Sequence, residues 1–361
     1  MAKAKSQKVI RVGVIGQGRS GYDIHVDHLR KDKRYKVVAV ADPLERQRAD
    51  AVRELGAEGY AKHGDLLARD DLDLVVNSTP SNLRVPVALE AFKAGHNVLC
   101  EKPLARTVKD VDKMIRAAKR AGKLLAIYQQ SRFAPYFQQV RKVIDSGVLG
   151  RIVMIKCAFN GFARRWDWQT LQENHGGNLL NTGPHPMDQV LQLFGDGMPK
   201  VKCIMYRANT WGNAEDHVKV LLTGKGHPTI DLEISSCAAY SPYTYLVYGT
   251  RGGMIATQRD ASWRYFNPKK APKQKLIRTP LEGRVYCREK LPWVEKTWTV
   301  PKARAHLFGT MAKQFYSHLY ATLAEGAPLV ITLEQVRRQI AVMEECHRQN
   351  PLSKKRRHGV S

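Results

Sequence analysis

The sequence predicts an α/β protein with an N-terminal doubly wound parallel sheet and a second α/β domain built on a large open, mainly antiparallel sheet. Up to residue 128, short apolar runs rich in β-branched residues alternate with helical patterns. After about residue 130, several strand-like runs follow one another with no helical pattern between them. A chain of 361 residues has room for two domains. We expect domains at 1–128 and 129–350, followed by a basic tail at 351–361.

The first domain is expected to contain five strands and four helices. Its apolar runs are short and continuous, which is typical of parallel strands covered on both faces. Gly56, Gly95 and Gly122 each follow a helical pattern, as glycines that end helices do. The expected strands are Val9–Ile15, Lys36–Ala41, Leu72–Asn77, Asn97–Cys100 and Leu124–Tyr128, and the expected helices are Arg19–Arg30, Leu44–Leu55, Arg84–Ala94 and Val108–Ala121.

The second domain is expected to begin with a helix at Ala134–Ser146 that leads into a strand at Arg151–Phe159. Later strands without intervening helices favour an antiparallel sheet. The stretch Pro268–Pro301 is the least regular and is expected to be a long surface excursion. The later strands are Val201–Arg207, His217–Thr223, Thr229–Ser235 and Tyr243–Tyr248, and two helices, Ala305–Glu325 and Leu333–Gln349, close the chain.

Composition excludes several classes of protein. The apolar fraction is 43% and the mean hydropathy is −0.40, which is ordinary for a globular protein. No run approaches the roughly 18 apolar residues of a membrane span, and the N-terminus lacks the apolar core of a signal peptide. The six cysteines lie dozens of residues apart without a C-x-x-C pair, which favours scattered thiols in a reducing cytosol over disulfides or zinc. We expect a cytoplasmic protein without a metal.

The charge is strongly basic, with 59 Lys and Arg against 33 Asp and Glu. Part of the excess lies at the termini, and the stretch Arg264–Lys296 holds ten basic residues against three acidic ones. No nucleic-acid motif accompanies either region. The pattern favours solvated basic surface, or attraction to anionic partners, over specific nucleic-acid recognition.

A glycine-rich motif, G-x-G-x-x-G, occupies Gly16–Gly21, directly after the first strand and at the start of a helix. Such glycines let the backbone approach a pyrophosphate, which the helix N-terminus stabilises. Asp42 ends the next strand, where a carboxylate can accept from ribose hydroxyls. Its charge favours NAD, although Arg46 and Arg48 could pair with a 2′-phosphate and keep NADP possible. The expected contacts here are Gly16, Gly18, Arg19, Ser20, Gly21, Asp42 and Arg46.

Three further segments carry a family resemblance. The sequence TPSNL at Thr79–Leu83, the Glu101-Lys102-Pro103 triplet and GGNLLNTGPHPMD at Gly176–Asp188 resemble the Gfo/Idh/MocA family, the glucose–fructose oxidoreductase and inositol dehydrogenase group. The resemblance implies a Rossmann domain, a C-terminal domain with a large open sheet, and an active site in the cleft between them. It adds as cofactor contacts Thr79, Pro80, Asn82, Glu101 and Lys102.

Members of this family mostly oxidise a secondary alcohol of a sugar or cyclitol and pass hydride to a nicotinamide. That step needs a base for the hydroxyl proton and a group that stabilises the developing oxyanion. The resemblance assigns Lys102 to this position, where Pro103 and a cationic nicotinamide would lower its pKa. His185 can exchange a proton near neutral pH, and we expect it to share the acid–base work with Lys102.

Two positions depart from the family pattern. Asn181 stands where the family usually has Asp, and its amide can hydrogen-bond a hydroxyl but cannot accept a proton. Arg84 stands where many members have His, as a helix-start cation or a cofactor contact.

The segment Arg164–Trp168 suits a polyhydroxylated ring, although a packed aromatic pair is the alternative. The expected substrate contacts are Arg132, Trp166, Asp167, Trp168, Asn181, His185 and Asp188.

We therefore expect an NAD(P)-dependent sugar or cyclitol dehydrogenase. Two alternatives stay open: a glycoside-cleaving enzyme that uses NAD for transient oxidation, and an NAD-dependent sensor without turnover.

Glu215-Asp216-His217 could suggest metal ligands, but structural hydrogen bonding is favoured because neighbouring strand residues face opposite sides. An open sheet has a face that needs cover, so we also expect a homo-oligomer.

Overall fold

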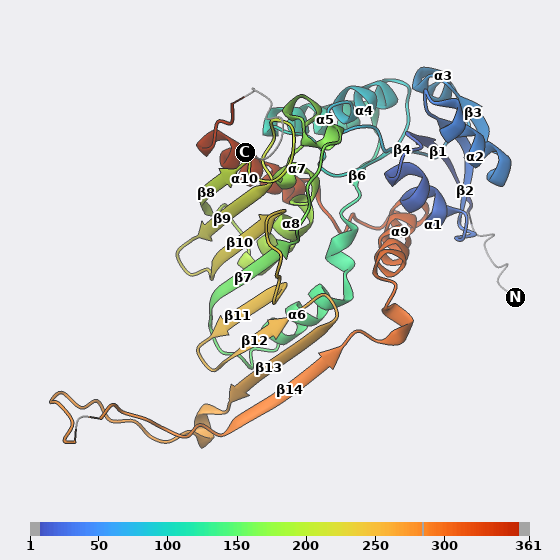
Figure 1. Ribbon diagram of the computed structural model, residues 1–361. Helices are drawn as coiled ribbons and strands as arrows, with labels where there is room; N and C mark the ends of the chain where they lie inside the picture. The colour runs from blue at the N-terminus through green and yellow to red at the C-terminus, as the bar shows by residue number, and fades with distance from the viewer. Residues whose placement is uncertain (1–7, 284, 354–361) are drawn as a thin grey trace, which may run out of the picture.

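The computed structural model describes residues 8–283 and 285–353. Its first sheet has six parallel strands in the order β3-β2-β1-β4-β5-β6, the doubly wound order of dinucleotide-binding proteins (Figure 1). Its strands are β1 Ile10–Ile15, β2 Tyr35–Ala41, β3 Glu58–Tyr60, β4 Leu74–Asn77, β5 Val98–Cys100 and β6 Leu125–Ile127, and its helices are η1 Ser20–Val26, α1 Asp27–Leu29, α2 Glu45–Leu55, α3 His63–Leu67, α4 Arg84–Lys93 and α5 Val108–Ala121.

The five predicted strands and four predicted helices of this region are all present. Gly56, Gly95 and Gly122 follow α2, α4 and α5 with φ of 63°, 85° and 61°, the left-handed conformation expected there. The first helix differs from expectation, because η1 is a π-helix before it continues as α1. β3 and α3 had not been predicted, since segments of three and five residues are too short to show a period.

The second sheet has eight strands in the order β14-β13-β12-β11-β7-β10-β9-β8. Only β7 and β10 pair in parallel, so the predicted open, mainly antiparallel sheet is confirmed. Its strands are β7 Ile152–Asn160, β8 Lys200–Tyr206, β9 His217–Thr223, β10 Thr229–Ser235, β11 Tyr245–Gly249, β12 Gly252–Ala256, β13 Asp260–Phe266 and β14 Trp293–Thr299.

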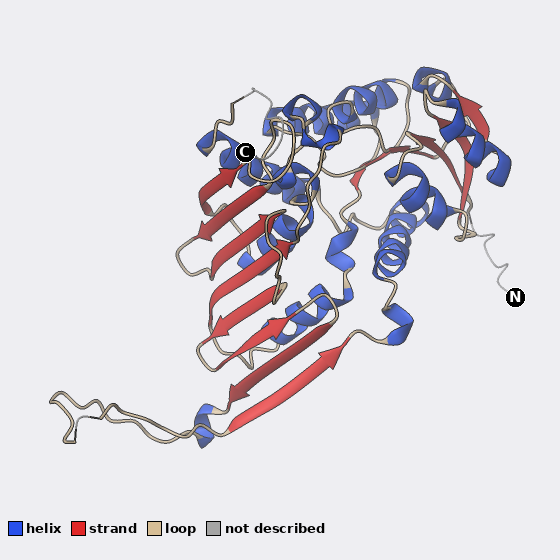
Figure 2. Cartoon of the chain, viewed as in Figure 1, coloured by secondary structure: helices blue, strands red, loops and turns tan. Residues whose placement is uncertain are grey.

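Helices lie on one face of this sheet, and no described helix covers the other (Figure 2). The last two helices connect the sheets: α9 packs against β1 as well as α6, and α10 packs against α5 as well as α8 and β8. This arrangement joins the two sheets through one continuous buried core. The helices here are η2 Gln130–Phe133, α6 Pro135–Asp145, α7 Asn178–Asn181, α8 Pro184–Phe194, α9 Leu307–Glu325 and α10 Leu333–Gln349.

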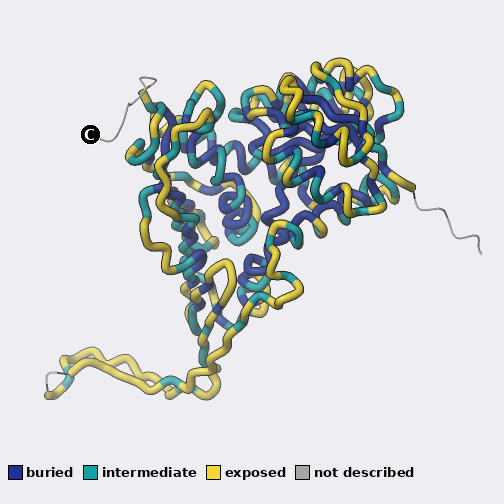
Figure 3. The backbone as a smooth tube through the Cα atoms, turned by 45° about the vertical axis from the view of Figure 1, so that its right-hand side comes forward, coloured by how far each residue is buried: buried dark blue, intermediate teal, exposed yellow. Residues whose placement is uncertain are grey.

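The interpretation of Pro268–Pro301 as one surface excursion was wrong in part, because β14 lies within it and pairs with β13. Almost every residue of β14 is exposed, so the strand has no apolar face by which the sequence could reveal it. The described residues of 267–292, which we call the arm, do project from the edge of the sheet and are mostly exposed (Figures 1 and 3).

Other expectations concern the termini and the cysteines. Lys3, Lys5 and residues 354–361 of the basic tail lie outside the described residues. All six cysteines are free thiols. Among the residues that the structure describes, no helix is long and apolar enough to cross a membrane.

Candidate active site

The glycine-rich turn lies between β1 and η1 and has room for a phosphate group. Gly16 has φ +87°, and a Cβ there would lie 2.8 Å from the carbonyl oxygen of Ser78. A Cβ on Gly21 would lie 1.7 Å from the carbonyl oxygen of Gly16, so only glycine fits. At Gly18, by contrast, a Cβ would meet nothing within 4 Å. The backbone is thus open at Gly18, next to a helix N-terminus, as a bound pyrophosphate requires.

Asp42 follows β2 and lies beside this turn. Its carboxylate accepts hydrogen bonds from the backbone N–H of Gln17 at 2.8 Å and of Leu44 at 2.9 Å. A carboxylate has further lone pairs, so acceptor capacity for ribose hydroxyls is left. Arg48 donates to the carbonyl oxygen of Asp42 at 2.7 Å, and Arg46 is exposed on α2. These residues would hold the adenosine end of a bound cofactor.

Arg84 connects the loops that follow β4 and β5. It is 6% exposed and donates to the carbonyl oxygens of Thr79 at 3.1 Å and Pro103 at 3.0 Å. The Thr79 hydroxyl in turn donates to Asn77 Oδ1 at 2.7 Å. Asn82 contacts the other domain through Asn174, at 3.4 Å. Arg84 therefore connects two loops inside the protein, and the sequence predicts that both loops contact the cofactor.

Lys102 lies just beyond the end of β5. Its ammonium donates to the backbone carbonyl of Asn181 at 3.0 Å, and its backbone N–H donates to Glu101 Oε2 at 2.9 Å. Glu101 is buried, 3.2 Å from the Nε2 of His25. Burial lowers the pKa of Lys102, and the positive charges of Arg84 and Arg19 lower it further, against the opposing effect of Glu101.

His185 lies in the first turn of α8. Its Nδ1 is buried and has no hydrogen-bond partner among the described residues. Burial and, next, the charge of Lys102 lower the pKa of His185 to about 3. The imidazole is therefore neutral across physiological pH, with a ring nitrogen left to meet a ligand hydroxyl.

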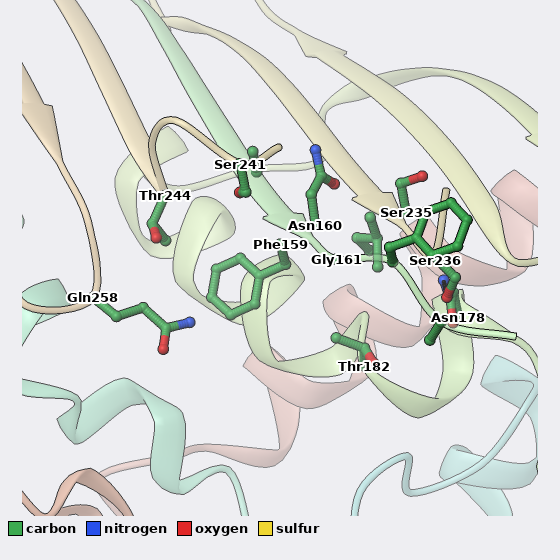
Figure 4. Close-up of a pocket in the computed structure, with 14 residues that line it drawn as sticks. Phe159, Asn160, Gly161, Asn178, Thr182, Ser235, Ser236, Ser241, Thr244 and Gln258 are labelled. Carbon is green, nitrogen blue, oxygen red and sulfur yellow. Dashed lines mark hydrogen bonds between the residues drawn. The ribbon is translucent and has the colours of Figure 1, made fainter. Parts of the chain in front are cut away.

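A cavity of about 470 Å³ lies beside the segment that carries His185 (Figure 4). Asn181, whose carbonyl accepts from Lys102, is followed directly by Thr182, which lines the cavity. No Lys, Arg, His, Asp or Glu belongs to its lining. Within the described chain, the side chains of Thr182, Ser241, Thr244 and Gln258 form no hydrogen bond. The lining comprises Ala158, Phe159, Asn160, Gly161, Phe162, Ala163, Asn178, Thr182, Ile234, Ser235, Ser236, Ser241, Thr244 and Gln258.

Sequence reasoning missed this lining altogether. It comes from β7, α7, the end of β10 and the loops that follow β7, α7, β10 and β12, and most of its polar residues stand in no recognisable motif. Only the positions of Asn178 and Thr182, inside the segment Gly176–Asp188, could have pointed to it.

The Arg164–Trp168 segment lies outside that lining. Trp166 is 79% exposed and Trp168 is 43% exposed. Asp167 pairs with Arg165 at 2.8 Å and accepts from the backbone N–H of Gln169. The Asn181 amide likewise donates to Gln169, at 3.3 Å. Contact of this segment with a substrate stays a prediction.

Arg132 and Asp188 form a buried ion pair. Arg132 also donates to Gln335 Oε1 at 2.6 Å and to the carbonyl oxygen of Val330 at 3.2 Å. The pair joins η2 to α8 and to the start of α10. Because their charged groups are engaged within the protein and the cavity lining excludes them, this geometry fits the positioning of α8 better than contact with a substrate.

Glu215 and Asp216 are also engaged internally. Asp216 accepts backbone hydrogen bonds from residues 208, 209 and 210 at 2.6–2.8 Å. Glu215 accepts from the N–H of Leu179 at 3.0 Å, and burial raises its pKa to about 7. The structural interpretation of this tripeptide agrees with the structure. The described residues contain no group of three or more His, Cys, Asp or Glu placed to hold a metal ion.

Comparison with known proteins agrees with this geometry. Residues 10–129 match an oxidoreductase family with an NAD-binding Rossmann fold, and residues 137–255 match the GFO/IDH/MocA C-terminal domain. The chain belongs to the Gfo/Idh/MocA oxidoreductase family. The match at 10–129 and the open glycine turn agree in identifying the first sheet as an NAD-binding Rossmann domain.

Relatives within the family have varied activities. The chain is 26% identical to 2,7-anhydro-N-acetylneuraminate hydratase of Mediterraneibacter gnavus, over 68% of this chain and 67% of that protein. It is 30% identical to D-glucoside 3-dehydrogenase of Escherichia coli, over 56% and 59%. A solved structure of GenD2 from gentamicin A biosynthesis, in complex with NAD, has a TM-score of 0.74 at 20% identity over 98% of this chain and 97% of that one, which shows a shared fold.

The Arg132–Asp188 pair predicts a stability effect. Asp188→Ala leaves a buried guanidinium without its partner, and we expect a loss of about 3–5 kcal/mol in the free energy of unfolding, measured by urea denaturation. Asp145→Ala removes an exposed i,i+4 pair with Arg141 and serves as the control, with little expected change. Equal stability of the two variants would contradict the structural role of Asp188.

Asp42 predicts cofactor preference. Asp42→Asn removes the charge that favours ribose hydroxyls and disfavours a 2′-phosphate. We expect the Kd for NADH to rise about 10- to 100-fold and the preference for NADH over NADPH to shrink, measured by fluorescence titration. Asp50→Asn, on exposed α2, should change neither Kd. If the ratio of the Kd values for NADH and NADPH is unchanged in Asp42→Asn, Asp42 does not contact the ribose hydroxyls.

Proposed function

We propose that this protein transfers hydride between a secondary alcohol of a sugar, glycoside or cyclitol and the nicotinamide of NAD(P). The observation that carries the proposal is an uncharged, hydroxyl- and amide-lined cavity whose lining includes Thr182. Thr182 follows Asn181, whose carbonyl accepts from Lys102, and the carbonyl of Thr182 accepts from the backbone N–H of His185. Such a lining suits a neutral polyhydroxylated ligand, because each free side chain can donate to or accept from a hydroxyl. The relative named D-glucoside 3-dehydrogenase supports the same substrate class.

The chain's residues divide the work as follows. A bound nicotinamide supplies the hydride acceptor or donor. Arg84 and Glu101 hold the Lys102 loop, and Lys102, with its lowered pKa, accepts the hydroxyl proton when an alcohol is oxidised. The neutral imidazole of His185 hydrogen-bonds the same hydroxyl and orients it. The backbone carbonyl of Asn181 accepts from Lys102, and its side chain, an amide rather than a carboxylate, accepts no proton in the reaction.

A second candidate is elimination or glycoside cleavage through transient oxidation of the sugar. The relative named as a hydratase supports it, since that activity involves no net redox change. The two candidates share the cofactor and Lys102, and differ in whether NADH accumulates. Purified protein with NAD⁺ and a panel of sugars, glycosides and inositols tests both. NADH absorbance that rises with substrate supports the dehydrogenase, and glycoside consumption without that rise supports the second candidate.

The role of Lys102 predicts a pH profile. Oxidation requires the neutral amine, so kcat/KM should rise with pH through a pKa below the ordinary lysine value of 10.5. Lys102→Met should lower kcat by about 10²- to 10⁴-fold and abolish this limb of the profile. Lys93→Met, at the exposed end of α4, is the control. A Lys102→Met enzyme that keeps the limb would assign the proton transfer to another group.

We also propose that a second copy of the chain covers the open face of the eight-stranded sheet. Large apolar side chains recur on this face and are between 37% and 58% exposed, more than a stable monomer usually presents together. Strand pairing places them on one side: Ile204, Tyr206, Leu221, Tyr248 and Ile255.

Charges placed on this face should separate the copies. We expect light scattering to give an oligomer for the unmodified protein and a monomer for the double variant Ile204→Glu and Ile255→Glu. Leu276→Glu, on the arm, should leave the mass unchanged. A monomeric unmodified protein at micromolar concentration would refute the proposal.

A further inference from the structure

Two aromatic side chains at the cavity are more exposed than their apolar character favours. Phe162 belongs to the lining, yet it is 62% exposed. Tyr240 is 91% exposed and directly precedes Ser241, which also belongs to the lining. An isolated exposed ring is ordinary on a protein surface. Two rings on adjoining segments of one polar cavity call for a functional explanation.

The segments that carry these rings are held together by backbone hydrogen bonds. Phe162 and Cys237 form an antiparallel bridge. The N–H of Ala163 donates to the carbonyl oxygen of Ser236 at 3.0 Å, and the N–H of Ala238 donates to that of Gly161 at 3.1 Å. The backbone around Phe162 is therefore fixed before any ligand binds, and Tyr240 follows two residues after Ala238, so ordering this backbone costs little entropy on binding.

The chemistry of the site changes from its interior to its edge. Away from the rings, Thr182 and the buried Thr244 offer free hydroxyl groups, and the exposed Gln258 offers a free amide (Figure 4). At the edge, the exposed rings offer apolar faces and no charge. A ligand complementary to both has a hydroxylated ring inside and a second ring, with an apolar face, outside.

We propose that Phe162 and Tyr240 form an outer subsite that stacks the second ring of a glycoside whose reacting ring occupies the cavity. The inference rests on the proposed function and narrows its substrate to glycosides over free monosaccharides and cyclitols. The outer ring is either an aryl aglycone or a second sugar, because both present an apolar face for stacking on an aromatic side chain.

The test compares glucosides that share the inner ring and differ in the outer group: methyl β-glucoside, phenyl β-glucoside and cellobiose. Both kcat/KM with NAD⁺ and the equilibrium Kd by calorimetry are measured. We expect the unmodified protein to favour phenyl β-glucoside or cellobiose over the methyl glucoside by about 10-fold. Phe162→Ala with Tyr240→Ala should remove that preference, because kcat/KM and affinity for phenyl β-glucoside and cellobiose fall to the level of methyl β-glucoside.

Tyr286→Ala is the matched control, since Tyr286 is 86% exposed on the arm. It should retain the preference, and Phe162→Trp should restore it relative to Phe162→Ala. Preference for phenyl β-glucoside alone identifies an aryl aglycone, and preference for cellobiose alone identifies a second sugar.

Two results would overturn the inference. One is equal binding of all three glucosides, or an equal loss for all three in the double alanine variant. The other is a fall in oligomer mass in that variant, which would place the two rings at a contact between copies. Failure of the proposed function is distinguishable, because it abolishes oxidation of every substrate while a preference in Kd still reports the subsite.

Discussion

The hydrogen bond from the Lys102 ammonium to the backbone carbonyl of Asn181 joins the loop after β5 to α7, where chemistry is expected. Burial disfavours the charged form of Lys102, and the neighbouring charges act on it in opposite directions. Glu101 stabilises the charge, whereas Arg84 and Arg19 oppose it. The carbonyl offers a dipole without a full charge, so it orients the ammonium and leaves the neutral amine accessible. A carboxylate in that contact would instead have held the proton on Lys102.

The polar groups around this contact form hydrogen bonds or ion pairs within the protein. Arg84 holds the loop from the cofactor side through two carbonyls, and the Arg132–Asp188 pair holds α8 from the other side. His25 connects Glu101 to Tyr316 on α9, with 2.7 Å between its Nδ1 and the tyrosine oxygen. Each group used in this way is unavailable to a ligand. Among the described residues near this contact, the Nδ1 of His185 and the side chains of Thr182, Thr244 and Gln258 keep hydrogen-bonding capacity for a ligand.

Much of the fold could be predicted because parallel strands are buried on both faces and leave continuous apolar runs. β14 could not, since a strand at the edge of a sheet with both faces in water has no such pattern. At the candidate site, motif spacing predicted the glycine turn, and the resemblance predicted roles for Lys102 and His185 that stay predictions. Neither could show that Arg132 and Asp188 pair with one another, because that depends on η2 meeting α8 in three dimensions.

The basic charge of the chain acts at long range, whereas the neutral lining of its cavity acts on a ligand only at short range. A net charge of +26 attracts anions of every kind at long range and does not distinguish among them. Discrimination has to come from short-range contacts, and no charged side chain belongs to the cavity lining. Under the proposed function, we expect an acidic sugar to bind poorly, because its carboxylate would lose hydration without gaining a charged partner in the lining. A neutral glycoside loses only hydroxyl hydration, which Thr182, Thr244 and Gln258 are placed to replace.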